Sequence, residues 1–109
     1  MTDIEELIAK LVEFRNERDW EQFHNSKDLA IAISIEANEL LEQFLWKHPE
    51  DAKPEKIKEE LADIFCFALL LAEKNGINIK EIVLEKIRAN AEKYPIDKSK
   101  GSSKKYNEL

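Results

Sequence analysis

Glycine, proline and cysteine are scarce in this chain of 109 residues, which contains two glycines, three prolines and one cysteine. So little turn-forming material disfavours a sheet of many hairpins, whereas the abundant Leu, Ile, Ala, Glu and Lys favour helix. The length suits one domain with one hydrophobic core. We therefore expect a single all-α domain over residues 1–109, arranged as a four-helix bundle.

Long apolar runs and cysteine pairs are absent as well. No apolar stretch reaches the roughly 18 residues that a membrane span needs, and the opening segment MTDIEELIAK is acidic where a signal peptide is basic. The single cysteine, Cys66, has no partner for a disulfide and lies in an apolar run, which predicts a buried thiol in a reducing compartment. We expect a cytoplasmic protein without a membrane partner.

Positive charge is also in short supply. The formal net charge is −6 at pH 7, which disfavours a nucleic acid polymer as the main partner, because proteins that bind one usually carry a basic surface. The charge is unevenly spread, however. Residues 94–109 hold four lysines against two acids, a local balance of +2.

Four helices are predicted by the spacing of apolar residues and by capping signals such as Gly76 and Asn78. They cover about residues 2–17, 26–46, 54–74 and 79–93. The segment RDWEQFHNS forms an aromatic loop, and the proline-bounded segment KHPEDAKP forms a surface connection. The helical core is then residues 1–93, and residues 94–109, with their Pro, Gly and Ser, form an extended tail.

Two of these helices each carry a pair of acids on the side expected to pack. Glu36 and Glu39 lie in SIEANELLEQFLW, on the opposite side from polar residues such as Glu42. Glu60 and Asp63 repeat the arrangement in EELADIFCFALLLA. Residues three apart on a helix are neighbours, so each pair can converge on one point. Buried carboxylates repel one another unless a cation lies between them.

A set of oxygen ligands without imidazole or thiolate selects a hard ion, so Mg²⁺, or alternatively Mn²⁺, is the expected metal. Such sites often combine a few carboxylates with the phosphates of a substrate. Two other interpretations stay open on the residues alone. The acids could form a solvated salt-bridge face, or they could belong to a di-iron bundle, which requires Glu-x-x-His pairs. The only such spacing is Glu21 to His24, in the loop.

The third helix is apolar nearly all round, since Asp63 is its only charge between Leu61 and Ala72. A helix of this kind needs cover on several sides. Three other helices of one small domain supply too little cover. We therefore expect a homo-oligomer, either a dimer or a tetramer.

Several segments of the chain carry a resemblance to a known family. They are EANELLEQFLWK, EELADI, the loop RDWEQFH, and the tail pattern NAEKYP followed by GSSKKY. Together they resemble the MazG-like all-α nucleoside triphosphate pyrophosphohydrolases, most of all the dCTP pyrophosphatase branch, from about residue 14 to the end of the chain. The resemblance implies cleavage of a nucleoside triphosphate between the α and β phosphates, which gives a monophosphate and pyrophosphate.

By this resemblance the two acid pairs are the metal ligands and the catalytic residues. A metal held by them neutralises the polyphosphate and lowers the pKa of a bound water. One of the acids could instead act as a general base, and the sequence leaves open which one.

The resemblance also supplies candidates for the nucleobase, Trp20, His24 and Trp46, because indole faces stack on bases and an imidazole can hydrogen-bond their edges. Core packing of the tryptophans and an exposed loop position for His24 are the alternatives. Where the dCTP branch commonly has a tyrosine one turn after the Asp ligand, this chain has Phe67. Its ring can stack, but it lacks the hydroxyl on which a selectivity for dCTP could rest.

Polar residues near the end of the chain are expected to bind the triphosphate of a (d)NTP substrate. They are Asn90, Lys93, Lys105 and Tyr106, with Arg88 as a further donor. A solvated lysine-rich end is the alternative, and it applies to Lys98, Lys100 and Lys104. The competing hypothesis for the whole chain is a non-enzymatic helical oligomerisation or nucleotide-binding regulatory module. That hypothesis explains the apolar third helix but not the aligned acid pairs.

Overall fold

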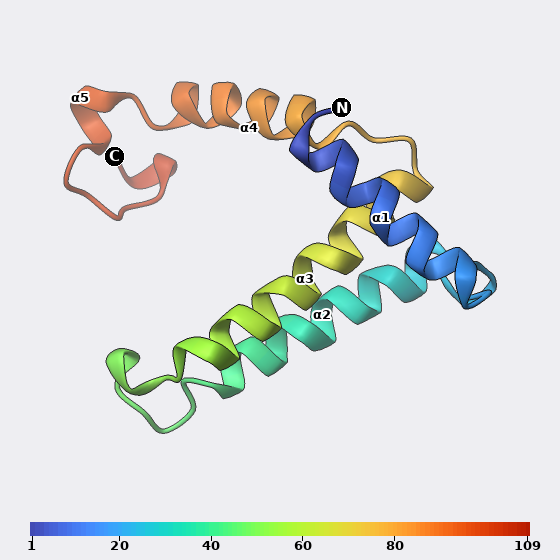
Figure 1. Cartoon of the computed structure of the whole chain (residues 1–109). Coiled ribbons are helices and arrows are strands. Elements are labelled where there is room, and N and C mark those ends of the chain that lie inside the picture. Colours follow the sequence, from blue (N-terminus) through green and yellow to red (C-terminus); the bar gives the residue numbers. More distant parts are fainter. The chain divides into compact units, whose positions relative to one another are not determined.

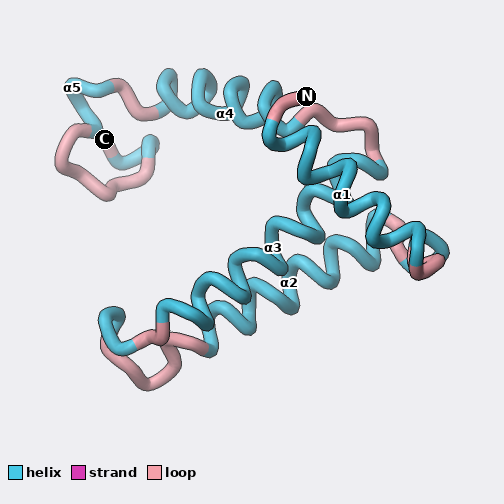
Figure 2. The backbone as a smooth tube through the Cα atoms, in the orientation of Figure 1, coloured by secondary structure: helices cyan, strands magenta, loops and turns pink.

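All 109 residues are described by the computed structural model, and every regular element is a helix (Figures 1 and 2). The chain forms two compact units, residues 1–77 and residues 78–109, and each is described by itself. The predicted all-α class is confirmed. None of the helices combines the length and the apolar character that a membrane crossing requires.

The first unit holds three long helices and two short 3₁₀ turns. They are α1 (Asp3–Glu17), η1 (Glu21–Phe23), α2 (Ser26–Glu42), η2 (Pro49–Asp51) and α3 (Pro54–Lys74). The second unit consists of α4 (Ile79–Lys93), α5 (Ile96–Ser99) and η3 (Tyr106–Glu108). The four long helices occur where the sequence predicts them, except that α2 ends early, at Glu42. Their arrangement as one bundle in one domain stays a prediction, because α4 belongs to the second unit.

Polar caps begin three of these helices. The Glu5 amide donates to the Thr2 hydroxyl at 3.2 Å, and the Thr2 amide donates to the Glu5 carboxylate at 3.0 Å. The Asp28 amide donates to the Asn25 side chain at 2.8 Å, which caps α2. Asn78 caps α4 in the same way, at 3.0 Å. Each cap satisfies an amide that the first turn of a helix leaves without a partner.

A proline and a glycine delimit α3. Pro54 lies in the first turn, where its missing N–H is not needed. Gly76 follows the helix with a φ of 62°, a left-handed conformation that glycine adopts without strain. The Gly76 amide donates to the Glu73 carbonyl at 3.2 Å, and the Ile77 amide donates to the Ala72 carbonyl at 2.9 Å. These are the hydrogen bonds of a Schellman motif, so α3 ends where the sequence predicts.

The frame of the first unit is the pair formed by α2 and α3. The two helices lie side by side and run in opposite directions (Figure 1), and α1 packs against α3. Leu29 of α2 is 1% exposed, and Leu69 and Leu70 of α3 are 6% and 5% exposed. Burial of one such side chain contributes about 1.5–3 kcal/mol. The few deeply buried leucines of the chain therefore belong to this pair.

The end of α2 differs from the prediction. The helix ends at Glu42 and does not continue to Trp46. The amides of residues 43–45 each donate to the carbonyl three residues back, and Trp46 has a φ of 60°. α2 is thus followed by turns with i→i+3 bonds, and the left-handed conformation of Trp46, unfavourable for a bulky residue, prevents these turns from continuing as a helix. The prediction of a helix through Trp46 is therefore wrong.

The predicted extended tail is also wrong in part, because residues 96–99 form α5 and residues 106–108 form η3. Pro95 precedes α5, and its carbonyl accepts from the Ser99 amide at 2.9 Å. Gly101 has a φ of 77°, which turns the chain after α5. The aromatic loop before α2 likewise contains one short helical turn, η1. Local backbone bonds over three or four residues thus add order to segments that lack apolar periodicity.

Replacing Leu29 by alanine should destabilise the first unit by about 2–5 kcal/mol, because the change leaves a cavity in its most buried position. Urea denaturation followed by circular dichroism measures the loss. Leu7→Ala is the matched control, because Leu7 lies on α1 and is 52% exposed. The Leu7 variant should lose only about 0.5 kcal/mol of unfolding free energy, the usual limit for a surface substitution. Equal losses for the two variants would contradict the role of Leu29.

Candidate functional site

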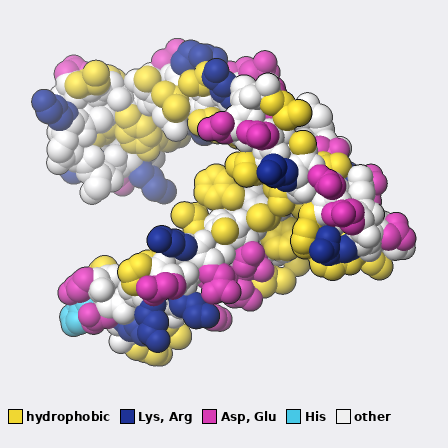
Figure 3. All heavy atoms as spheres, viewed as in Figure 1, with side chains coloured by type: hydrophobic (Ala, Val, Ile, Leu, Met, Phe, Trp, Pro, Cys, Tyr) yellow, Lys and Arg dark blue, Asp and Glu magenta, His cyan; other side chains and the backbone are white.

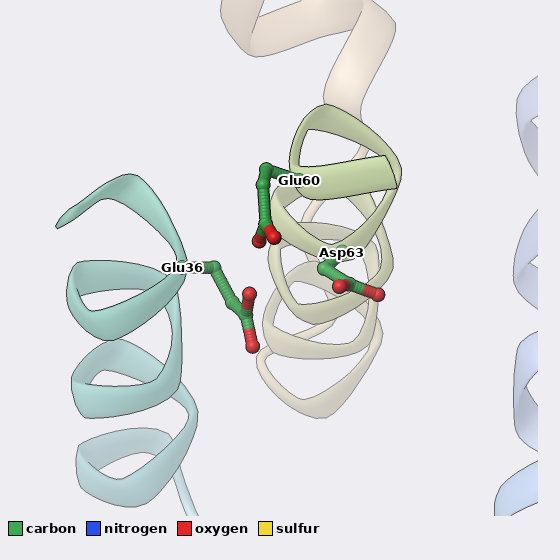
Figure 4. Close-up of side chains that lie close together, drawn as sticks. All are labelled: Glu36, Glu60 and Asp63. Carbon is green, nitrogen blue, oxygen red and sulfur yellow. The ribbon is translucent and has the colours of Figure 1, made fainter. Parts of the chain in front are cut away.

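Three carboxylates from two helices meet where α2 faces α3. Figure 4 shows Glu36 pointing from α2 toward the side of α3 that carries Glu60 and Asp63. One carboxylate oxygen of each residue lies within 4.8 Å of the other two. The acids of α3 are neighbours because three residues make almost one helical turn. The antiparallel course of the helices then places Glu36 opposite them. We call these three residues the acid cluster.

Glu39, the fourth predicted ligand, lies beside the acid cluster and not in it. Its oxygens are not among the three that lie within 4.8 Å of one another. The side chain is half-buried, whereas Glu42 on the same helix is exposed, as the sequence predicts. Glu39 is nonetheless close enough to raise the pKa of both Glu36 and Glu60. It therefore adds negative charge to the cluster from its edge.

The acid cluster is unfavourable when all its groups are charged. The Oε2 atoms of Glu36 and Glu60 are buried and have no hydrogen-bond partner. Burial, followed by the neighbouring Glu39, raises the pKa of Glu36 to about 7. The same two causes raise the pKa of Glu60. Desolvated carboxylates in contact favour a bound proton or cation.

The donor set of this cluster fits a hard divalent ion. All three ligand atoms are carboxylate oxygens, and oxygen ligands suit Mg²⁺ or Mn²⁺ better than zinc or copper. The two unpartnered oxygens are free to coordinate such an ion. Glu36, Glu60 and Asp63 could thus hold a metal, with Glu39 beside it. Their role as ligands stays a prediction.

A cavity of about 530 Å³ lies next to the cluster, within the first unit. Its walls come from α1, from the loop before α2, and from α3. The lining residues are Leu11, Phe14, Arg15, Trp20, His24, Asp63, Cys66, Phe67 and Leu70. The volume is in the range of small-molecule sites, roughly 300–1,000 Å³. Asp63 belongs to both the acid cluster and the cavity wall, so the two features form one site.

The cavity brings together three residues that the sequence predicts to bind a base, Trp20, His24 and Phe67. The rings of His24 and Phe67 meet edge to face, with centroids 6.5 Å apart. The Nδ1 atom of His24 is buried and has no hydrogen-bond partner. Burial, then the positive charges of Arg15 and Lys74, lower the pKa of His24. The imidazole is therefore neutral at neutral pH and can exchange hydrogen bonds with a ligand.

Trp20 is held at the cavity by residues of α1. Its amide donates to the Arg15 carbonyl at 3.1 Å, and its ring meets Phe14 edge to face with centroids 5.8 Å apart. The Arg18 guanidinium lies 3.6 Å from the centroid of the Phe14 ring. Asp19 has a φ of 54°, which turns the chain between α1 and the indole. The Trp20 side chain is 43% exposed, so part of its surface stays available for stacking.

Trp46, the other predicted tryptophan, does not line the cavity. It is 95% exposed and follows the end of α2. The predicted helix over residues 26–46 would include Trp46, but α2 ends at Glu42. A role of Trp46 in binding a base stays a prediction.

The residues predicted to bind the triphosphate belong to the second unit. Asn90 and Lys93 lie on α4, and Lys105 and Tyr106 lie near the end of the chain. The Lys93 ammonium is 5.0 Å from the centroid of the Tyr106 ring, a cation–π contact. Tyr106 also meets Tyr94 edge to face, with centroids 6.1 Å apart. These contacts bring Lys93 and the tail together, while their binding role stays a prediction.

Five residues of the cavity wall are missed by the sequence analysis: Leu11, Phe14, Arg15, Cys66 and Leu70. The two on α3 follow Asp63 by three and seven residues, so helical spacing from that acid would have indicated them. The three on α1 share one helix face, but no local signal tells which helix α1 meets. Cys66 is a free, half-buried thiol, not a fully buried one, and burial raises its pKa.

Without metal, the chain should become less stable as the pH rises from 5 to 8. Glu36 binds its proton more tightly when folded, with a pKa of about 7, than when unfolded, with a pKa of 4.5. This stabilisation is fully present below the unfolded value and is lost as the pH rises through the folded value. Thermal unfolding at the two pH values, with a chelator present, measures the difference.

Glu36→Gln is the variant that tests this assignment, and Glu42→Gln is its control because Glu42 is exposed on the same helix. The Glu36 variant should unfold at a higher temperature than the unaltered chain at pH 8 and should depend less on pH. The Glu42 variant should behave like the unaltered chain. An identical pH dependence in all three proteins would contradict the raised pKa of Glu36.

Known proteins resemble this chain in both sequence and structure. A family model described as the MazG-like family matches residues 31–109. The dCTP pyrophosphatase 1 of Bos taurus is 38% identical over 117 residues, which cover 100% of this chain and 68% of the relative. The protein of that name from Homo sapiens is 36% identical, with 100% and 67% covered.

A solved structure adds the same likeness in three dimensions. A pyrophosphatase from Archaeoglobus fulgidus superposes with a TM-score of 0.81 at 38% sequence identity, and the match covers 87% of this chain and 94% of that one. The resemblance that the sequence motifs indicate is thereby confirmed. The chain belongs to the MazG-like family.

Proposed function

We propose that this chain hydrolyses dCTP, or a related pyrimidine deoxynucleoside triphosphate, to the nucleoside monophosphate and pyrophosphate, with Mg²⁺ or Mn²⁺ as its cofactor. That the chain is a nucleoside triphosphate pyrophosphatase follows from its family and from relatives named dCTP pyrophosphatase 1. The observation that carries the finer proposal is the position of Asp63, which belongs to both the acid cluster and the cavity. A nucleoside in the cavity would direct its phosphates toward the acids.

The acid cluster would hold the metal through Glu36, Glu60 and Asp63. When bound, a divalent ion neutralises the polyphosphate, polarises the phosphorus and lowers the pKa of a coordinated water. Glu39 lies at the edge of the cluster, and its carboxylate would take the proton that the attacking water releases. Because Glu39 lies outside the group of three ligand oxygens, its position supports a role as a general base, while the other three acids bind the metal.

The cavity would hold the nucleobase and the sugar. Trp20 offers a stacking surface, and the neutral His24 offers a hydrogen bond from a buried ring nitrogen. Phe67 packs against the edge of His24 and keeps that ring in place. The apolar side chains of Leu11 and Leu70 would exclude water from the base.

Donors for the triphosphate would come from Asn90, Lys93, Lys105 and Tyr106. Lysine ammonium groups and a tyrosine hydroxyl form charge-assisted hydrogen bonds with phosphate oxygens. The cation–π contact between Lys93 and Tyr106 keeps two of these donors near each other. Such proximity lowers the entropy that is lost when a polyphosphate binds.

We further propose that the chain forms a homo-oligomer through the outer face of the α2–α3 pair. The exposed apolar residues of this face are Ile31, Ile35 and Leu41 on α2, with Leu61 and Phe65 on α3, and they are 43–64% exposed. A spacing of four residues aligns Ile31 with Ile35 on α2 and Leu61 with Phe65 on α3, and Leu41 lies farther along α2. Apolar side chains also reach the surface of the first unit in Figure 3. Apolar side chains that stay this exposed would be covered by a second copy of the chain at an interface.

In the presence of Mg²⁺, the purified chain should release pyrophosphate, and not phosphate, from dCTP. The measurement is a panel of deoxynucleoside triphosphates assayed for both products. We expect the highest kcat/KM with a pyrimidine substrate, because the relatives are named dCTP pyrophosphatase 1. A chelator should abolish the activity, and added Mg²⁺ should restore it.

Asp63→Asn is the decisive variant, because it removes one charge from the cluster. It should lower kcat at least about a hundredfold, as the loss of a key electrostatic contact does, with equal or higher thermal stability since repulsion is relieved. Glu42→Gln is the matched control and should keep full activity. If no triphosphate yields pyrophosphate, the non-enzymatic module becomes the better explanation. If Asp63→Asn fails to fold, the acid is structural.

Phe65→Glu should dissociate the oligomer, because a charge would be buried in an apolar interface. Sedimentation velocity should give a multiple of 12.7 kDa for the unaltered chain and a smaller mass for the variant. Leu7→Glu serves as the control, since Leu7 is 52% exposed on α1 and lies outside the proposed face. A monomeric unaltered chain would refute the interface.

A further inference from the structure

Arg15 is the one charged side chain that is buried in this chain, with 4% of its surface exposed. It lies on α1, one turn after Leu11, and both residues line the cavity. Its Nη1 atom donates to Glu73 Oε2 at 3.0 Å, and its Nε atom donates to Asn16 Oδ1 at 3.1 Å. These two contacts lie on different edges of the guanidinium and fix its plane.

The Nη2 atom of the same group makes no hydrogen bond within the chain. Its nearest carboxylate oxygen is Glu21 Oε2 at 3.8 Å, beyond the length of a hydrogen bond. A guanidinium carries five N–H donors. The two N–H groups of Nη2 have no acceptor within the chain. Nη2 is not among the side-chain atoms that are both fully buried and without a partner, so it keeps accessible surface. Because Arg15 lines the cavity, a ligand there can supply the missing acceptors.

We propose that Arg15 is the residue that selects the nucleobase, by donating from Nη2 to an edge that presents two adjacent acceptors. This inference rests on the proposed function and deepens it. Cytosine has such an edge, because O2 and N3 are both acceptors. Uracil and thymine carry a proton on N3, which would oppose an N–H donor. Among the residues of the cavity wall, Arg15 alone has a permanent positive charge.

Glu73 acts here as a positioning residue. It lies near the end of α3, and its bond to Arg15 joins residues that are 58 positions apart in the chain. The bond holds the guanidinium so that Nη2, and not Nη1, is left for a ligand. Arg15 also holds the loop, because its carbonyl accepts from the Trp20 amide at 3.1 Å. A base stacked on Trp20 would therefore have its edge read by the same residue that places the indole.

The test compares Arg15→Met and Arg15→Lys with the unaltered chain on three substrates: dCTP, dTTP and deoxyribose 5′-triphosphate, which has no base. Arg15→Lys keeps the charge opposite Glu73 and so keeps the fold, but it lacks Nη2. In both variants, kcat/KM for dCTP should fall about tenfold to a hundredfold, as expected for one charge-assisted hydrogen bond. The loss should lie in KM, and the preference for dCTP over dTTP should disappear.

Turnover of the substrate without a base should not change in either variant. Lys74→Met is the matched control, because Lys74 also faces Glu21, at 3.9 Å, but does not line the cavity. This control should keep the preference for dCTP. An unchanged preference in Arg15→Lys overturns the proposal. An equal loss on all three substrates also overturns it, since Arg15 would then serve the fold alone.

A binding measurement separates this inference from the proposed function. Calorimetric titration with deoxycytidine and with thymidine, in the absence of metal, should show tighter binding of deoxycytidine, and Arg15→Lys should remove the difference. If the unaltered chain hydrolyses no triphosphate but shows this preference, the proposed function fails and the role of Arg15 stands. If it hydrolyses dCTP and Arg15→Lys keeps the preference, the role of Arg15 fails alone.

Discussion

The pairing of α2 with α3 is the contact on which the rest of this structure depends, because it places like charges against one another where water screens them poorly. Burial of leucines such as Leu29 and Leu69 stabilises the pair. The same approach sets Glu36 against Glu60 and raises the pKa of both carboxyl groups, chiefly through burial. Hydrophobic burial thus holds together acids that would otherwise separate. A local conflict of this kind is typical of a functional site.

A second buried charge, of opposite sign, also belongs to the site. Arg15 is buried on α1 and paired with Glu73 of α3 at 3.0 Å. A buried ion pair contributes little net stability, since desolvation of both charges offsets their attraction. What it provides here is geometry, because it joins α1 to α3, while the Arg15 carbonyl anchors the loop that carries Trp20. The cavity wall therefore includes both Asp63 of the acid cluster and the Arg15 guanidinium.

The features that could be predicted from the sequence are those decided within a few residues. Gly76 and the asparagine caps set helix ends through local hydrogen bonds, and those ends were predicted. The end of α2 was not, because no glycine or proline stands at the point where Trp46 adopts its left-handed conformation. The acids were found because a charge on an apolar helix face stands out. In the sequence, an apolar cavity residue such as Leu70 has the same pattern as any other core residue, so it could not be identified as part of the site.

The sequence by itself determined the class of fold, the position of the acids and the family, since helical periodicity and short motifs are properties of neighbouring residues. Only the tertiary structure decided which acids share a centre and which stands beside it, because that depends on how two helices face each other. It also decided that Arg15 joins Trp20 and His24 around one cavity. The physical reason is that burial and ion pairing act between distant segments, whereas sequence patterns report only on near neighbours.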